Sequence, residues 1–165
     1  RGRDMAMPSA PRSRLHEDVA TIEAIFARKD GGRRISAIKD ELGMMMNDKV
    51  AVFRDEEGLR EAHETIGRLK EESEVAAIDD RGTVFNQDVL GAIELGYLLT
   101  CAEATVVAAI ERKESRGAQW RLDYPERNDE EWLKHIDLTR GEDGEMGISY
   151  SPVTITQWQP EVRKY

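Results

Sequence analysis

The sequence predicts a mainly α-helical fold, in which an antiparallel bundle of three to four helices precedes a small irregular α+β tail. No proline occurs between Pro11 and Pro125, so long helices can run there without interruption. All three tryptophans and three of the four tyrosines lie after residue 115, where the regular apolar spacing of the earlier segments ends. We therefore expect a spectrin-repeat-like bundle over residues 14–116, preceded by a linker at 1–13 and followed by an extended tail at 117–165.

The first two helices are predicted from apolar residues that recur every three or four positions, which places them on one helix face. Near 15–29 and 36–48 these stripes are Leu15, Val19, Ile22 and Phe26, and then Ile38, Leu42 and Met45. Ser36 belongs to a residue type that caps helix N-termini, so the second helix is expected to begin there. Each stripe should face a shared core.

The third helix is expected near 55–74, because three consecutive acidic residues stand at its start, where the helix dipole favours anions. Its apolar stripe is Leu59, Ala62, Ile66 and Leu69. The remaining faces of this helix carry charge, as expected for a helix that covers a core from one side.

The fourth helix, predicted over 89–110, is apolar nearly all round and should therefore run through the middle of the bundle. Asn86 is a good N-cap, and Phe85 can pack onto Leu90 across it as a hydrophobic staple. The most apolar stretch, 98–110, contains a glutamate and is too short to span a bilayer.

Three polar residues on the fourth helix need a specific environment. Glu94 and Glu103 must be paired or exposed at a groove, because an isolated carboxylate is costly to bury. Salt bridges to arginines on neighbouring segments are the simplest arrangement, and an interface role is the alternative. Cys101 is expected to be a packed core thiol.

The tail has short elements of mixed type. Asn128 and Glu131 have the spacing of a capping box, which predicts a short helix through 131–134. Residues 135–139 and 148–155 have strand character and are separated by a turn-rich segment at 141–144. Because the tail has few regularly spaced apolar residues, we expect it to lie along another surface.

Composition excludes several classes of function. The formal net charge of −9 argues against a broad surface that binds nucleic acid. The chain has no glycine-rich dinucleotide fingerprint and no Walker-type phosphate loop, and its three histidines are far apart in sequence. One cysteine cannot form an internal disulfide and fits a reducing compartment. We therefore expect no catalytic, cofactor-binding or metal-binding residue in this chain.

An ordered series of motifs points to a family. The motifs are VFRDEEGL at 52–59, TVFNQD at 83–88, ELGYLL at 94–99, RKESRGA at 112–118, DYPERND at 123–129, WLKH at 132–135, YSPV at 150–153 and PEVRKY at 160–165. From about residue 50 to the C-terminus this series resembles the C-terminal domain of succinate dehydrogenase and fumarate reductase flavoprotein subunits. Two positions depart from the family pattern, with Gln119 where a histidine is usual and Asn128 where an aspartate is common.

The resemblance implies a FAD-dependent succinate dehydrogenase, a succinate:quinone oxidoreductase of the tricarboxylic acid cycle and electron transport. It implies upstream flavin and capping domains that hold FAD and the substrate, with residues 1–13 as the linker from the flavin domain. It also implies an iron–sulfur subunit and a quinone-binding membrane anchor, which would hold the subunit at the cytoplasmic, inner face of the cell membrane. This chain by itself would bind no FAD and catalyse nothing.

Two alternatives remain open from the sequence: the same domain of L-aspartate oxidase, and a freestanding helical interaction module whose aromatic tail docks on a partner. For the leading interpretation, Glu94, Glu103, Arg116 and Arg127 are the candidates for bracing this domain against the flavin domain. Arginine suits that role because its fork binds carboxylates with two bonds. The equal alternative is that Arg116 and Arg127 tie the bundle to its own tail.

Overall fold

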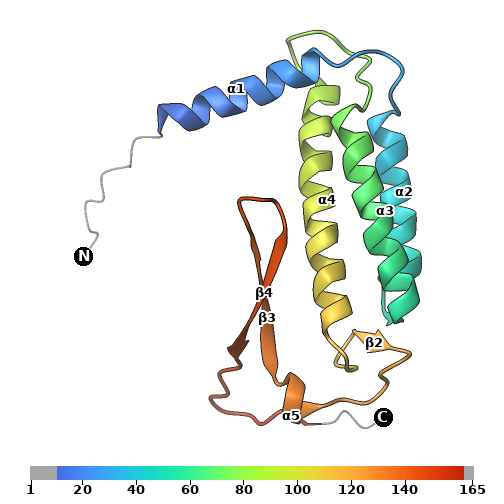
Figure 1. The fold of residues 1–165 in the computed structure, drawn as a ribbon, viewed down its shortest axis with the longest axis vertical. Coiled ribbons are helices and arrows are strands. Elements are labelled where there is room, and N and C mark those ends of the chain that lie inside the picture. Colours follow the sequence, from blue (N-terminus) through green and yellow to red (C-terminus); the bar gives the residue numbers. More distant parts are fainter. Residues whose placement is uncertain (1–10, 162–165) are drawn as a thin grey trace.

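The computed structural model describes residues 11–161, in which three antiparallel helices stand side by side, a fourth helix projects from one end and the tail crosses the other end (Figure 1). The three bundle helices are α2 (Ile35–Lys49), α3 (Glu56–Glu74) and α4 (Gln87–Glu111). This arrangement confirms the predicted helical bundle with a small mixed tail. Residues 1–10 of the expected linker and residues 162–165 lie outside the described part of the chain.

The bundle core is aliphatic and is formed by the predicted stripes of α2 and α3. The α3 stripe is fully buried along its whole length, from Leu59 to Leu69, as expected. From α2, Ile38 and Leu42 are buried, and Met45 packs against the core from its edge. Residues from one face of α4 complete the core, namely Val89, Leu95, Leu99, Ala102, Val106 and Ala109.

Local hydrogen bonds explain where two of these helices begin. The Asp55 carboxylate accepts a hydrogen bond from the backbone N–H of Gly58 at 2.7 Å, and Asn86 Oδ1 accepts one from the N–H of Val89 at 2.9 Å. Each bond satisfies a donor that the first turn leaves without a helical partner. The predicted cap at Ser36 is wrong, because α2 begins at Ile35, after Arg34, without a side-chain cap.

The predicted staple between Phe85 and Leu90 is also wrong. Phe85 has a positive φ of 52°, and its side chain is 91% exposed, so it does not pack onto α4. Leu90 is exposed as well. The chain bends just before α4, and the left-handed backbone conformation of Phe85 is part of this bend. A hydrophobic staple would require the Phe85 side chain to lie on the first turn of α4, which it does not.

Helix α1 (Arg12–Phe26) differs most from the prediction. It projects from the end of the bundle instead of lying along it (Figure 1), and only Ile25 is buried. Leu15, Val19 and Ile22, which were expected to face the core, are exposed. The C-terminal end of α1 contacts α4, and there Phe26, the last residue of the predicted stripe, packs against the core as expected.

Helix α4 is likewise covered on one side only, so the expectation that it runs through the middle is wrong. Leu90, Tyr97 and Leu98 are exposed on its other side, and so is Cys101, which is therefore not a core thiol. By length and composition α4, with 25 residues, could cross a membrane, although the shorter stretch at 98–110 was expected not to. Its packing on α2 and α3 is instead that of a core helix in a bundle.

The tail returns to the bundle before it forms a hairpin. Strand β2 (Trp120–Arg121) pairs in parallel with β1 (Phe53–Arg54), which lies in the α2–α3 connection. Helix α5 (Asp129–Trp132) follows Asn128, whose side chain accepts a hydrogen bond from the N–H of Glu131, so the predicted N-cap is confirmed. The helix ends two residues before the predicted end at 134, because the chain enters β3 there. The predicted strands form an antiparallel hairpin, β3 (Lys134–Arg140) with β4 (Met146–Pro152).

Candidate functional site

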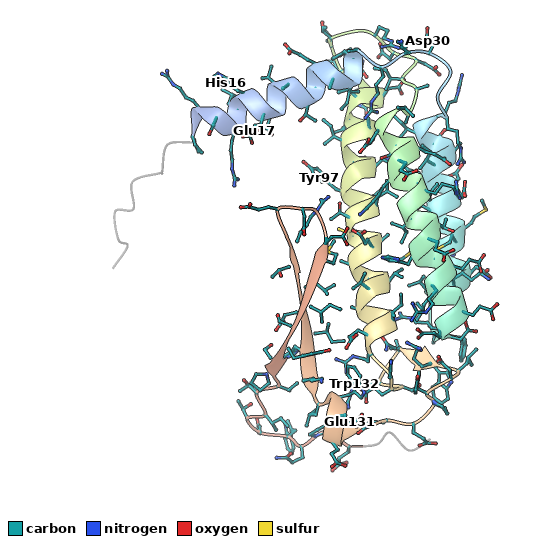
Figure 2. All side chains as sticks on the ribbon, viewed as in Figure 1. His16, Glu17, Asp30, Tyr97, Glu131 and Trp132 are labelled. Carbon is teal, nitrogen blue, oxygen red and sulfur yellow. The ribbon has the colours of Figure 1, made fainter. Side chains whose placement is uncertain are left out.

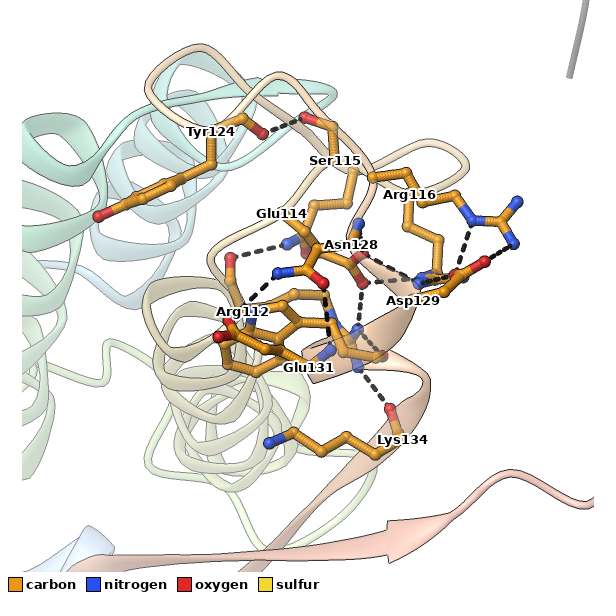
Figure 3. Close-up of polar contacts among 12 residues, drawn as sticks. Arg112, Glu114, Ser115, Arg116, Tyr124, Asn128, Asp129, Glu131 and Lys134 are labelled. Atoms are coloured by element: carbon orange, nitrogen blue, oxygen red, sulfur yellow. Dashed lines mark hydrogen bonds and ion pairs between the residues drawn. The ribbon is translucent and has the colours of Figure 1, made fainter. Parts of the chain in front are cut away.

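The densest group of polar contacts lies where α4 passes into the tail, around the Glu114 carboxylate (Figure 3). The side chain of Glu114 has no exposed surface. It accepts hydrogen bonds from Arg112 Nη1 at 2.6 Å, from Arg116 Nε at 2.7 Å and from the backbone N–H of Asn128 at 2.9 Å. We call Arg112, Glu114, Arg116, Asn128 and Asp129 the Glu114 cluster.

The cluster joins three segments that are separate in sequence. Arg112 is the C-cap of α4, and its guanidinium also donates to the carbonyls of Trp132 and Lys134, at 3.0 and 2.8 Å. Arg116 donates to Asp129 Oδ1 at 2.6 Å, next to the start of α5. The end of α4, the start of α5 and the start of β3 are therefore held by one set of charge-assisted bonds.

Hydrogen bonding keeps the acids of this cluster ionised. Burial raises the pKa of Glu114, but the bonds from Arg116, the Asn128 N–H and Arg112 outweigh burial, so the pKa is lower than usual. Arg127 and Arg116 lower the pKa of Asp129 to about 2. Glu114 and Asp129 are therefore both ionised near neutral pH, and each is hydrogen-bonded to arginine side chains.

A second buried charge, Arg121, ties the tail to the bundle. Its side chain is fully buried and donates to both carboxylate oxygens of Asp123, each at 2.8 Å, and to Glu56 at the start of α3, also at 2.8 Å. It also donates to the carbonyl of Ala109 at 2.7 Å, in the last turn of α4, where carbonyls lack helical partners. The Asp123 bonds raise the pKa of Arg121.

Gln119 lies beside these clusters, at the position where the resemblance implies a histidine. Its side-chain oxygen accepts a hydrogen bond from Arg54 Nη1 at 3.0 Å, and its side-chain nitrogen donates to the Arg112 carbonyl at 3.4 Å. The position therefore needs one acceptor and one donor. A neutral histidine provides the same pair, whereas a protonated one would oppose Arg54.

The structure places the four bracing candidates in two separate regions. Arg116 and Arg127 both bind Asp129, and Arg127 also donates to the carbonyl of Glu161 at 2.6 Å. Glu94 and Glu103 lie on α4 and pair with lysines of α2 and α3, where arginines were expected. These pairs are Lys39–Glu94 at 3.2 Å and Lys70–Glu103.

Sequence reasoning missed the two most buried charges, Glu114 and Arg121. A usable signal was present, because Glu114 stands between Arg112 and Arg116 directly after an apolar helix, and Arg121 stands two residues before Asp123. Within residues 11–161, every buried side-chain nitrogen or oxygen has a hydrogen-bond partner. Fully paired groups of this kind can fix the position of a tail, whereas acid–base chemistry needs a group that is free to exchange a proton.

Comparison with known proteins gives consistent matches. A family model described as "Fumarate reductase flavoprotein C-term" matches residues 39–165. The fumarate reductase flavoprotein subunit of Haemophilus influenzae is 42% identical over 157 residues, which cover 95% of this chain and 26% of that protein. The succinate dehydrogenase flavoprotein subunit of Rickettsia bellii is 33% identical, covering 97% of this chain and 28% of that protein.

A solved structure agrees with the sequence matches. The chain superposes on a structure of Escherichia coli quinol fumarate reductase with a TM-score of 0.83 and 33% identity, covering 94% of this chain and 27% of that chain. The chain thus spans about a quarter of the length of the curated relatives that it matches.

Proposed function

The chain belongs to the family of succinate dehydrogenase and fumarate reductase flavoprotein subunits, and from this premise we propose that it is the C-terminal structural domain of a FAD-dependent succinate:quinone oxidoreductase. The observation that carries the proposal is the family match over residues 39–165, which includes most of α2, all of α3 and α4, and the tail. The same matches favour this assignment over L-aspartate oxidase and over a freestanding interaction module.

In the whole subunit, FAD and the substrate belong to the upstream flavin and capping domains. A hydride passes there between a C4 dicarboxylate and the flavin, and electrons continue to an iron–sulfur subunit and a quinone-binding membrane anchor. The subunit is then peripheral to the inner face of the cell membrane. The present chain contributes a rigid support, and the division into a linker at 1–13, a bundle at 14–116 and a tail at 117–165 is part of this proposal.

The outer edge of the Glu114 cluster is suited to bracing against the flavin domain. Asp129 is exposed, and it binds two arginines that are themselves partly exposed, Arg116 and Arg127. Because Arg116 and Arg127 already hold the Asp129 carboxylate in one position, it can accept further hydrogen bonds from a neighbouring domain with little additional loss of side-chain entropy. Glu94 and Glu103 supply a second candidate contact on α4.

The bracing role is tested by Arg116→Ala in the full subunit, with Arg34→Ala as a control, because Arg34 also forms an ion pair but lies at the far end of the bundle. We expect Arg116→Ala to lower flavin content, succinate oxidation and assembly together, and Arg34→Ala to leave all three unchanged. If Arg116→Ala alters only the tail, as seen by local proteolysis, Arg116 ties the bundle to its own tail and does not brace the flavin domain.

The assignment itself is tested on the native protein. An antibody against this chain should capture, from non-denatured extract of the source organism, a polypeptide several times larger that contains flavin and reduces a dye when succinate is added. A captured protein of this chain's own size without flavin would overturn the assignment and favour the interaction module. A flavoprotein that oxidises L-aspartate instead would favour the oxidase.

A further inference from the structure

The β3–β4 hairpin rises beside α4 but buries little of its own surface (Figure 1). In the described part of the chain, no residue of β3 or β4 is buried, and the apolar side chains of β3, Ile136 and Leu138, are only half-buried. A two-stranded hairpin is at best marginally stable by itself in water. Specific contacts to the bundle must therefore hold it in place.

The hairpin is attached to the bundle at its base, where β3 begins and β4 ends. Trp132, directly before β3, lies at this base, next to the end of α4 (Figure 2). The Arg112 guanidinium donates hydrogen bonds to the carbonyls of Trp132 and Lys134. On the other strand, the hydroxyl of Tyr150 donates to the carboxylate of Glu111, the last residue of α4. Both strands are therefore bonded to the end of the same helix.

The ammonium group of Lys134 lies against two aromatic rings at once. Its nitrogen is 4.7 Å from the centre of the Trp132 ring and 3.9 Å from the centre of the Tyr150 ring. The faces of aromatic rings attract cations within about 6 Å. A tyrosine whose hydroxyl donates to a carboxylate has a more electron-rich ring, so the bond to Glu111 strengthens the attraction between Tyr150 and Lys134. The three side chains therefore reinforce one another.

The position of Glu111 supports this interpretation. It is the last residue of α4, where the negative end of the helix dipole disfavours a carboxylate. A neutral glutamine could accept the Tyr150 bond without that cost. The charge of Glu111 thus points to a role that a neutral acceptor does not fill, which is the attraction of Lys134 through the Tyr150 ring.

We propose that Glu111, Tyr150 and Lys134 form a latch that holds the β3–β4 hairpin closed against α4, and that the hairpin opens separately from the bundle when this latch is broken. The far end of the hairpin carries Arg140, which lines a groove together with Tyr97 of α4. Opening therefore uncovers this part of α4. The inference concerns a conformational device within the domain and does not rest on the proposed function.

The latch is tested by Tyr150→Phe in the full-length protein, which removes the hydroxyl but keeps the ring beside Lys134. We expect amide hydrogen exchange in the peptides of residues 134–152 to become about fivefold faster, a modest effect because Tyr150 is half-exposed. Exchange in α3 should not change. The matched control is Tyr124→Phe, because the Tyr124 ring also lies beside a cation, Arg121, at 5.1 Å. This control should leave exchange in the hairpin unchanged.

Two further variants test the part played by the lysine. Lys134→Met keeps the apolar stem but removes the charge, so it should accelerate exchange in the hairpin as Tyr150→Phe does. Lys134→Arg keeps a cation that also binds aromatic rings, so exchange should stay close to that of the parent protein.

A double variant tests whether Glu111 acts through Tyr150. We expect Glu111→Gln to accelerate exchange in the parent protein but to add nothing in the presence of Tyr150→Phe. If the two effects add, Glu111 acts independently and the latch is wrong. Unchanged exchange in Tyr150→Phe, equal acceleration in Tyr124→Phe, or normal exchange in Lys134→Met would each overturn the proposal. Equal acceleration in α3 would show that the hairpin does not open separately, and this result overturns it too.

Discussion

In the bundle helices, the side chains with no exposed surface are aliphatic, such as Leu59 and Ile66 of α3, whereas beyond the end of α4 they are the charged side chains of Glu114, at the junction, and Arg121, in the tail. Within the described part of the tail, residues 117–161, one large apolar residue is buried, Trp132, and the Arg112 guanidinium lies over its ring at 5.5 Å. The bundle is therefore held by removal of apolar surface from water, and the tail by oriented hydrogen bonds between charged groups.

The two kinds of stabilisation should make the bundle and the tail respond differently to acid and to substitution. Apolar burial is not directional and does not depend on protonation. Charge-assisted bonds fix a single geometry, but they fail when one partner is lost or neutralised, because the other is then left buried and unpaired. The bundle should tolerate acid, and the tail should not. Charge-assisted hydrogen bonds suit a tail that must hold a fixed position against another domain.

The largest effect is expected from Arg121→Ala. This change removes the partner of Asp123 and Glu56 and exposes the last carbonyls of α4, so it should destabilise the chain by about 4 kcal/mol. All three tryptophans lie in the tail, so their fluorescence reports the tail, while far-UV circular dichroism reports the helices. We expect urea unfolding followed by fluorescence to shift to lower concentration than unfolding followed by circular dichroism.

The matched change in the bundle is Ile66→Ala, which leaves a cavity among aliphatic neighbours. It should cost about 3 kcal/mol and shift both signals equally. If Arg121→Ala shifted both signals equally too, the two regions would unfold as one unit and the comparison would fail.

The next largest effect is expected from acid, which should unfold the tail at a higher pH than the bundle. The pKa values of Glu114, Asp123 and Glu56 are lowered in the fold, and that of Asp129 falls to about 2. A group with a lowered folded pKa contributes stability above its unfolded pKa of about 4, and that stability is lost as the pH falls toward the folded value.

We therefore expect the tryptophan signal to change between about pH 4 and pH 2, before the helical signal does. The bundle also carries acids with lowered pKa values, Glu41 and Glu72, but their pairs with Arg33 and Arg68 lie at the surface and contribute little. Coincident loss of both signals would show that the surface pairs of the bundle matter as much as the Glu114 cluster.

The smallest effect is expected from Gln119→His, which restores the residue that the family pattern usually has. Near pH 8 a neutral histidine can accept from Arg54 and donate to the Arg112 carbonyl, so stability should stay within about 1 kcal/mol. The neighbouring Arg54 should hold the pKa of this histidine below about 6.5. Stability should then fall as the pH drops from 7 toward 5, where the parent chain is unchanged. No difference between the two chains at pH 5 would contradict this.

The sequence predicted the structure best in the helix whose apolar stripe is the face that the fold buries. In α3 the charged faces and the apolar stripe leave one way to pack, and the stripe from Leu59 to Leu69 is buried as expected. In α1 the same spacing was misleading, because Leu15, Val19 and Ile22 mark an apolar face without saying what covers it. The buried charges at the junction of bundle and tail were missed, since the burial of Glu114 depends on Asn128, which lies 14 residues away.

The helical bundle, the mixed tail and the family could be predicted from the amino-acid sequence, because helix periodicity, capping residues and an ordered motif series are local properties of the chain. Which apolar faces meet inside the bundle, and which remain exposed on α1 and α4, depends on the packing of the whole fold. The same packing makes Glu114 and Arg121 buried, paired joints between bundle and tail. Burial is a property of all the neighbours of a residue at once, and neighbours distant in sequence are fixed only when the whole chain folds.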